Sequence, residues 1–132
     1  MKLRDILEQH SDKNIKDIGT GTSCFEKHGM GLFARYPFNN TCQGEICHVH
    51  DTDFAMHMNL HPNDLKEVLK KGWGQRHPLA CKTWLRMPVP RQFSLVYAPR
   101  NMEELKIVCK IIEAAGWWVM AKDYEIDTLQ DA

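Results

Sequence analysis

Residues 45–62, EICHVHDTDFAMHMNLHP, decide how this chain is expected to fold. Two segments, 45–50 and 54–60, flank the turn-prone Asp-Thr-Asp of residues 51–53. In a strand, residues i and i+2 lie on the same face, and the second segment places its large apolar residues, Phe54, Met56, Met58 and Leu60, at this spacing. The stretch therefore predicts a β-hairpin.

Histidines are concentrated in this hairpin, and strand periodicity predicts where they point. His48 and His50 project to one face of the first strand, and Cys47 projects to the other. His57 lies opposite the large apolar residues of its own strand, so we expect it to face solvent or a cleft. Directly opposed Cβ atoms lie about 4.5–5.5 Å apart, so three imidazoles can share one patch. Glu45 belongs to the Cys47 face unless a bulge or the strand end returns it to the other. Spacing alone leaves open whether this patch is a site or a solvated polar face.

The rest of the chain continues a mixed pattern of helices and strands. Pro62 suits a first helical position, and Asn101 can cap a later helix that has Glu104 three residues on. The pattern predicts an α+β fold in which an antiparallel sheet packs against two main helices, with residues 1–132 forming a single domain. The expected helices are 2–9, 62–71 and 101–119, and the expected strands are 22–27, 31–36, 45–50, 54–60 and 93–98.

Composition excludes several classes of function. Lysine plus arginine and aspartate plus glutamate each total 17, so no net charge draws the protein to nucleic acid or to an anionic membrane. No apolar run approaches the roughly 20 residues of a membrane span, and we expect a cytoplasmic protein without a membrane segment. The 5 cysteines contain no CxxC pair, which argues against a structural zinc cage and a disulfide framework.

Four blocks of sequence together resemble a known family. They are His48-Val49-His50-Asp51, the second-strand His57, KEVLKKGWGQRHPLA at residues 66–80 and YAPRN at residues 97–101. In order and spacing these blocks resemble the luciferase domain of bioluminescent fungi and its non-luminous homologues. The resemblance extends from about Glu45 to Trp117.

The resemblance implies an activity and a set of site residues. In the luminous fungi this domain is an oxygenase that adds O2 to a 3-hydroxylated styryl-pyrone derived from hispidin. For this chain, the resemblance implies a small-molecule substrate, O2 as co-substrate and no cofactor. Histidine suits deprotonation of an enol, and arginine suits stabilisation of the enolate. The expected catalytic residues are His48, His50, His57, His77 and Arg100. The expected substrate-binding residues are Trp73, Arg76, Tyr97, Glu45 and Asp51.

Two other functions remain open at this point. His48, His50 and His57 could bind a divalent metal such as zinc or iron, with Glu45 or Asp51 as a further ligand. The domain could also bind a small molecule without catalysis.

Arg100 has two alternative placements. It is expected to point into the same pocket as the histidines, and the alternative is an ion pair with Glu103 or Glu104. In the same way, Trp73 could wall the pocket or fill the core beneath a helix end.

Overall fold

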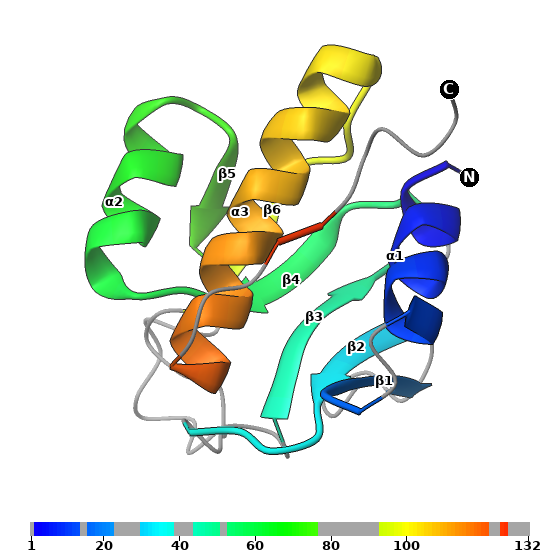
Figure 1. Ribbon diagram of the computed structural model, residues 1–132. Helices are drawn as coiled ribbons and strands as arrows, with labels where there is room; N and C mark the ends of the chain where they lie inside the picture. The colour runs from blue at the N-terminus through cyan, green and yellow to red at the C-terminus, as the bar shows by residue number, and fades with distance from the viewer. Residues whose placement is uncertain are drawn as a thin grey trace.

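The computed structural model describes residues 2–13, 16–22, 30–38, 44–50, 53–76, 93–121 and 125–126. These residues form one antiparallel sheet with the strand order β1-β2-β3-β4-β6-β5, together with three helices (Figure 1). This is the α+β fold that the sequence predicts. The elements in chain order are α1 (Lys2–Lys13), β1 (Ile18–Thr22), β2 (Met30–Ala34), β3 (Glu45–Val49), β4 (Met56–Asn59), α2 (Pro62–Lys70), β5 (Gly74–Arg76), β6 (Phe93–Val96) and α3 (Met102–Met120).

The hairpin predicted from residues 45–62 forms the centre of the sheet. β3 pairs with β4 so that Cys47 lies opposite Met58 and Val49 lies opposite Met56. These four side chains are buried in the main core. The long helix α3 crosses β2, β3 and β4, and α1 packs on β1 and β2, both on the same side of the sheet (Figure 1). The core therefore lies between the sheet and these helices.

Both main helices begin as their sequences indicate. At α2 the ring Nδ1 of His61 accepts the backbone N–H of Asn63 at 3.1 Å, and Pro62 occupies the first turn. At α3 the side chain of Asn101 accepts the N–H of Glu104 at 2.9 Å. Gly72, with φ of +78°, follows α2 in the left-handed conformation that glycine adopts without strain.

Two strands differ from the prediction. The first described strand is Ile18–Thr22, which was not predicted, and the predicted strand 22–27 lies, apart from Thr22, outside the described residues. Gly19 and Gly21 lie within this strand, and glycine gives no apolar alternation by which a strand is recognised. The sequence also gave no sign of β5, a three-residue edge strand paired with β6.

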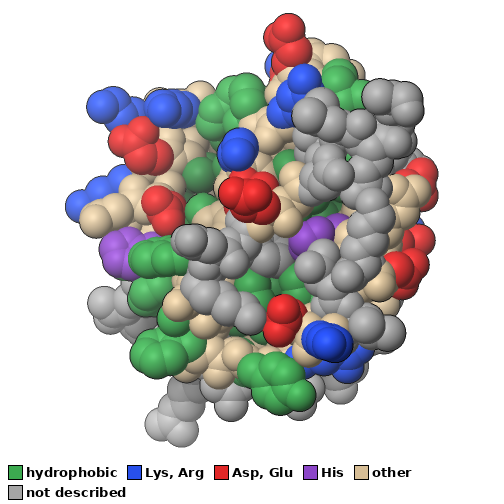
Figure 2. Space-filling view, viewed as in Figure 1, with side chains coloured by type: hydrophobic (Ala, Val, Ile, Leu, Met, Phe, Trp, Pro, Cys, Tyr) green, Lys and Arg blue, Asp and Glu red, His purple; other side chains and the backbone are tan. Residues whose placement is uncertain are grey.

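The surface carries charges of both signs. On the face shown in Figure 2, the described acidic and basic side chains are interspersed rather than gathered into a patch of one sign. None of the described helices combines the length and apolarity needed to cross a bilayer.

Candidate functional site: a buried histidine cluster

His48 and His57 form a directly opposed pair on β3 and β4. His48 Nε2 and His57 Nδ1 lie 3.1 Å apart, and the two rings are nearly perpendicular with centroids 4.8 Å apart. Because Cys47 points into the core, the alternation of the strand places His48 on the opposite face of the sheet. The predicted facing of the histidines is therefore confirmed.

His57, which was expected to face solvent or a cleft, is buried, and so is His48. His48 is 0% exposed and His57 is 5% exposed. Strand periodicity assigns a side chain to a face but does not say whether that face is covered. Burial matters for the chemistry, because a polar interaction out of contact with water is stronger than the same interaction at the surface.

His50 brings a third ring to the pair. Its centroid lies 4.4 Å from that of His57 and 5.8 Å from that of His48. The His50 N–H donates to Ala55 O at 2.9 Å, which extends the hairpin one residue beyond β3. The side chain is 20% exposed, so His50 is the point at which the cluster reaches the surface.

Asp53 holds the His50 ring from the turn of the hairpin. Its Oδ1 lies 3.3 Å from His50 Nδ1 and accepts the Ala55 N–H at 3.0 Å. The hydrogen bond from Ala55, and then the nearby His50, lower the pKa of the Asp53 carboxyl below its usual value. Phe54 between them has φ of +58°, a conformation that is strained for an aromatic residue. The turn thus holds the carboxylate against the imidazole.

A β-bulge brings Glu45 to the histidine face. Leu32 pairs with Cys47 and the next residue, Phe33, pairs with Glu45, so Ile46 is the extra residue on β3. The bulge reverses the alternation, and Glu45 Oε1 lies 3.4 Å from His48 Nδ1 with both side chains buried. The sequence left open whether a bulge returns Glu45 to the histidine face, and in the structure a bulge does so.

The two carboxylates favour particular ring tautomers. An ionised carboxylate accepts hydrogen bonds, so a proton on His48 Nδ1 would face Glu45 and would leave His48 Nε2 to accept one from His57 Nδ1. In the same way, a proton on His50 Nδ1 would face Asp53 and would leave His50 Nε2 as an acceptor.

Three other predicted residues lie together, but they line a separate cavity. Trp73, Tyr97 and Arg100 border a hollow of about 370 Å³ that does not include the histidines. Arg100 Nη2 lies 2.7 Å from Glu104 Oε2, and the Arg100 side chain is 83% exposed. Arg100 therefore takes the alternative placement considered for it, an ion pair with Glu104, rather than a position in a pocket with the histidines. It lowers the pKa of the Glu104 carboxyl below its ordinary value.

The remaining predicted residues lie apart from the cluster or cannot be placed. Arg76 is exposed on β5, where it pairs in register with Ser94. His77 and Asp51 lie outside the described residues. Asp53, two positions after Asp51, is the carboxylate found on His50. Both residues belong to the turn-prone Asp-Thr-Asp, and the sequence alone offered no basis for choosing Asp53 as the partner of His50.

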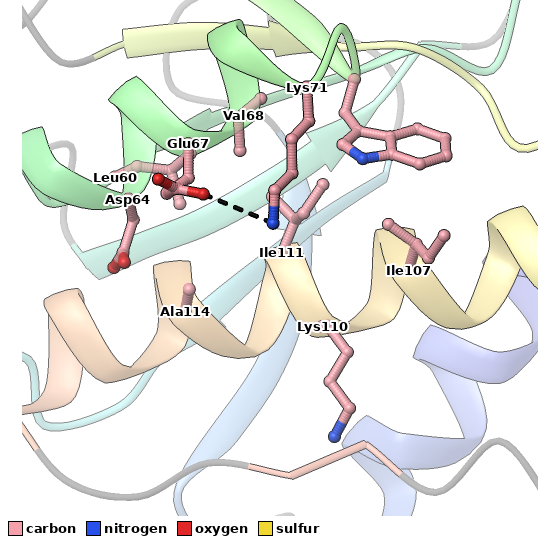
Figure 3. Close-up of a pocket in the computed structure, with 10 residues that line it drawn as sticks. Leu60, Asp64, Glu67, Val68, Lys71, Ile107, Lys110, Ile111 and Ala114 are labelled. Carbon is pink, nitrogen blue, oxygen red and sulfur yellow. Dashed lines mark ion pairs between the residues drawn. The ribbon is translucent and has the colours of Figure 1, made fainter.

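A second cavity lies between α2 and α3 (Figure 3). It measures about 210 Å³, and most of its wall is apolar. Lys71 and Glu67 form an ion pair of 3.4 Å at its rim. Its lining residues are Leu60, Asp64, Glu67, Val68, Lys71, Trp73, Ile107, Lys110, Ile111 and Ala114. The cavity shares only Trp73 with the residues predicted for a substrate site.

Comparison with known proteins identifies the family. The family model described as Luciferase domain matches residues 43–115, which include β3, β4 and the histidine cluster. A luciferase of Neonothopanus nambi is 40% identical over 125 residues, covering 83% of this chain and 44% of that protein. Luciferases of Armillaria gallica and Armillaria ostoyae are each 53% identical over 73 residues, covering 54% of this chain and 26% of those proteins.

The chain therefore spans less than half the length of these relatives. No solved structure matches it. The family match covers more than half of the chain and coincides with the hairpin that builds the cluster. This protein belongs to the luciferase domain family.

Proposed function

We propose that this protein is a luciferase-like enzyme that adds O2 to an enolisable, conjugated small molecule, and that the histidine cluster is where the enol is ionised. The observation that carries the proposal is the convergence of His48, His50 and His57 beside Glu45, within the segment shared with the fungal luciferases. A 3-hydroxylated styryl-pyrone is the substrate class that the family resemblance favours.

The cluster can accept the proton of an enol. His50 Nε2 is an acceptor because His50 Nδ1 is turned to Asp53, and His50 is the partly exposed member of the group. Imidazole suits this step because its ordinary pKa lies near neutral pH. The enolate can then pass an electron to O2. Both oxygen atoms enter the substrate, which is oxidised as O2 is reduced, so the reaction needs no external reductant.

The enolate also needs a positive charge close to it, and Arg100 does not supply one in this arrangement. Its guanidinium is hydrogen bonded to both oxygens of Glu104 at the surface. The carboxylate cancels most of the field that an enolate would feel. We therefore assign the ionisation of the substrate to the cluster and give Arg100 no part in it.

Oxygen uptake tests the proposal directly. The purified chain is mixed with 3-hydroxyhispidin and with a panel of other enols, and oxygen consumption, carbon dioxide release and light are recorded. We expect uptake with at least one conjugated enol, and a loss of at least about 100-fold in rate for His50→Ala. His61→Asn is the matched control, since it removes a histidine outside the cluster and keeps a cap for α2.

Binding without oxygen uptake across the panel would contradict an enzymatic role. It would leave the non-catalytic binding domain as the better description. Uptake that is equal in the parent and in His50→Ala would place the reaction elsewhere in the molecule.

A further inference from the structure

The ring nitrogens of the cluster are arranged as ligands around one point. One nitrogen from each of His48, His50 and His57 lies within 4.8 Å of the other two. Two imidazole nitrogens bound to one ion at about 2.0–2.1 Å stand about 3.0–3.4 Å apart, depending on the geometry. The separation of His48 Nε2 and His57 Nδ1 is 3.1 Å. This pair already has the spacing of two ligands on one ion, and His50 offers a third nitrogen within 4.8 Å of both.

Carboxylates stand behind two of the three rings. Glu45 faces Nδ1 of His48, and Asp53 faces Nδ1 of His50. A metal-binding histidine usually donates its second ring N–H to a carboxylate or carbonyl, which fixes the tautomer and makes the ligating nitrogen more basic. Both rings would then present Nε2 to an ion. A solvated polar face has no need for carboxylates behind two of its rings.

A cation also suits the charge of the site. Glu45 is 5% exposed, and its carboxylate lies beside His48. A divalent ion on the far side of His48 would compensate that charge through the ring. It would also provide the positive field for an enolate that the Arg100–Glu104 pair does not.

We propose that His48, His50 and His57 bind one divalent transition-metal ion through His48 Nε2, His50 Nε2 and His57 Nδ1. On binding, His57 would carry its proton on Nε2, so that the hydrogen bond between His57 Nδ1 and His48 Nε2 is replaced by two bonds to the ion. Three neutral imidazoles select zinc, iron, cobalt, nickel or copper over magnesium and calcium, which prefer oxygen ligands. Three protein ligands leave at least one position open for water or for the oxygen of a small molecule.

This inference deepens the proposed function, and its catalytic meaning rests on that function. With an ion bound, the three nitrogens are ligands rather than free bases. The ion would make an enol oxygen in the open position more acidic, so that the enol would release its proton to water and stay bound as the enolate. The metal binding itself depends only on the geometry of the cluster, so it can be tested without turnover.

The test is a metal titration of the purified chain after removal of ions with a chelator. Co²⁺ is added while visible absorption is recorded, and Zn²⁺ is added in competition with a chromogenic chelator. We expect one equivalent to bind, and an absorption spectrum typical of Co²⁺ with nitrogen ligands in low coordination. Binding of less than about a tenth of an equivalent would overturn the proposal.

Variants locate the ion. Replacing a ligand, as in His50→Ala or His57→Ala, should weaken binding by at least about 100-fold, and Glu45→Gln should weaken it by about 10–100-fold through His48. His61→Asn should bind as the parent does. His50→Ala keeps the test decisive if His57→Ala fails to fold, because the His50 ring is partly exposed. Unchanged affinity in His50→Ala would overturn the site.

Oxygen uptake separates this inference from the proposed function. Metal binding without uptake would support the site and contradict the enzymatic proposal. An undiminished rate of oxygen uptake by the metal-free protein would overturn the catalytic role assigned to the ion. A histidine of the cluster would then be the base that ionises the enol.

Discussion

His48 Nε2 and His57 Nδ1 lie 3.1 Å apart at directly opposed positions of β3 and β4, on the face of the sheet away from α3. Both rings are buried, and each of the two ring nitrogens has the other as a partner. The consequences of this relationship can be measured, first in the stability of the fold.

Replacing His57 should cost more stability than replacing His50. His57→Ala leaves a cavity at a site that is 5% exposed and removes the 3.1 Å contact with His48 Nε2, so we expect a loss of about 1–3 kcal/mol in the free energy of unfolding. His50→Ala removes a ring that is 20% exposed, and should cost less than about 1 kcal/mol. Urea denaturation of the metal-free proteins gives both values. Equal losses would mean that the two rings are equally accessible.

Gly74→Ala should destabilise the edge of the sheet. A Cβ at this position would overlap Leu95 O, a backbone atom of β6 that cannot turn aside. We expect a loss of about 2 kcal/mol or more, or detachment of β5. Gly72→Ala is the matched control. A Cβ there meets nothing within 4 Å, so only the left-handed backbone opposes it, at about 1 kcal/mol. Thermal unfolding should rank Gly74→Ala as the less stable variant.

Removing Arg100 should raise the pKa of Glu104. The hydrogen bonds from Arg100 are the main reason that this carboxyl has a lowered pKa, and Arg100→Ala removes the side-chain bonds. Carboxyl chemical shifts followed by NMR against pH would show the change. A lowered pKa in the folded state contributes stability that is present above the unfolded pKa and lost as pH falls through the folded pKa. The difference in stability between the parent and Arg100→Ala should therefore shrink in acid.

Arg100→Lys supplies the control for this ion pair. Lysine keeps the charge, so we expect it to retain most of the effect on Glu104 and to leave metal binding and oxygen uptake unchanged. A large loss of metal binding or of oxygen uptake in Arg100→Lys would mean that Arg100 belongs to the functional site.

The protein should lose stability in alkali through its buried thiols. Burial, with a smaller effect of Glu113, raises the pKa of Cys109 from 9.0 to about 11, and burial raises that of Cys47 further. A raised folded pKa contributes stability that is present below the unfolded pKa and lost as pH rises through the folded pKa. The loss should begin near pH 9 and continue to about pH 11 for Cys109.

Cys109→Ala isolates this contribution. Its free energy of unfolding should fall less steeply with pH than that of the parent over the same interval, whatever its value at neutral pH. A parallel slope in the two proteins would mean that Cys109 does not titrate differently in the folded and unfolded states.

The sequence determined the parts of this protein that depend on neighbouring residues. The β3–β4 hairpin follows from alternation at period 2, so the shared face of His48 and His57 could be predicted. Pro62 and Asn101 marked the starts of α2 and α3, because a cap is a contact within one turn of the helix. Local patterns of this kind do not require knowledge of the rest of the fold.

Only the tertiary structure decided the chemistry of the cluster. Glu45 reaches His48 because of a bulge, and the bulge is a mismatch between β3 and a strand about 15 residues earlier in the chain. Asp53 meets His50, and that contact depends on the path of the backbone through the turn. Arg100 pairs with Glu104 and lines a different cavity. Each outcome is set by which distant segments touch, and burial, which makes the histidine pair chemically distinctive, is a property of the assembled fold rather than of any segment.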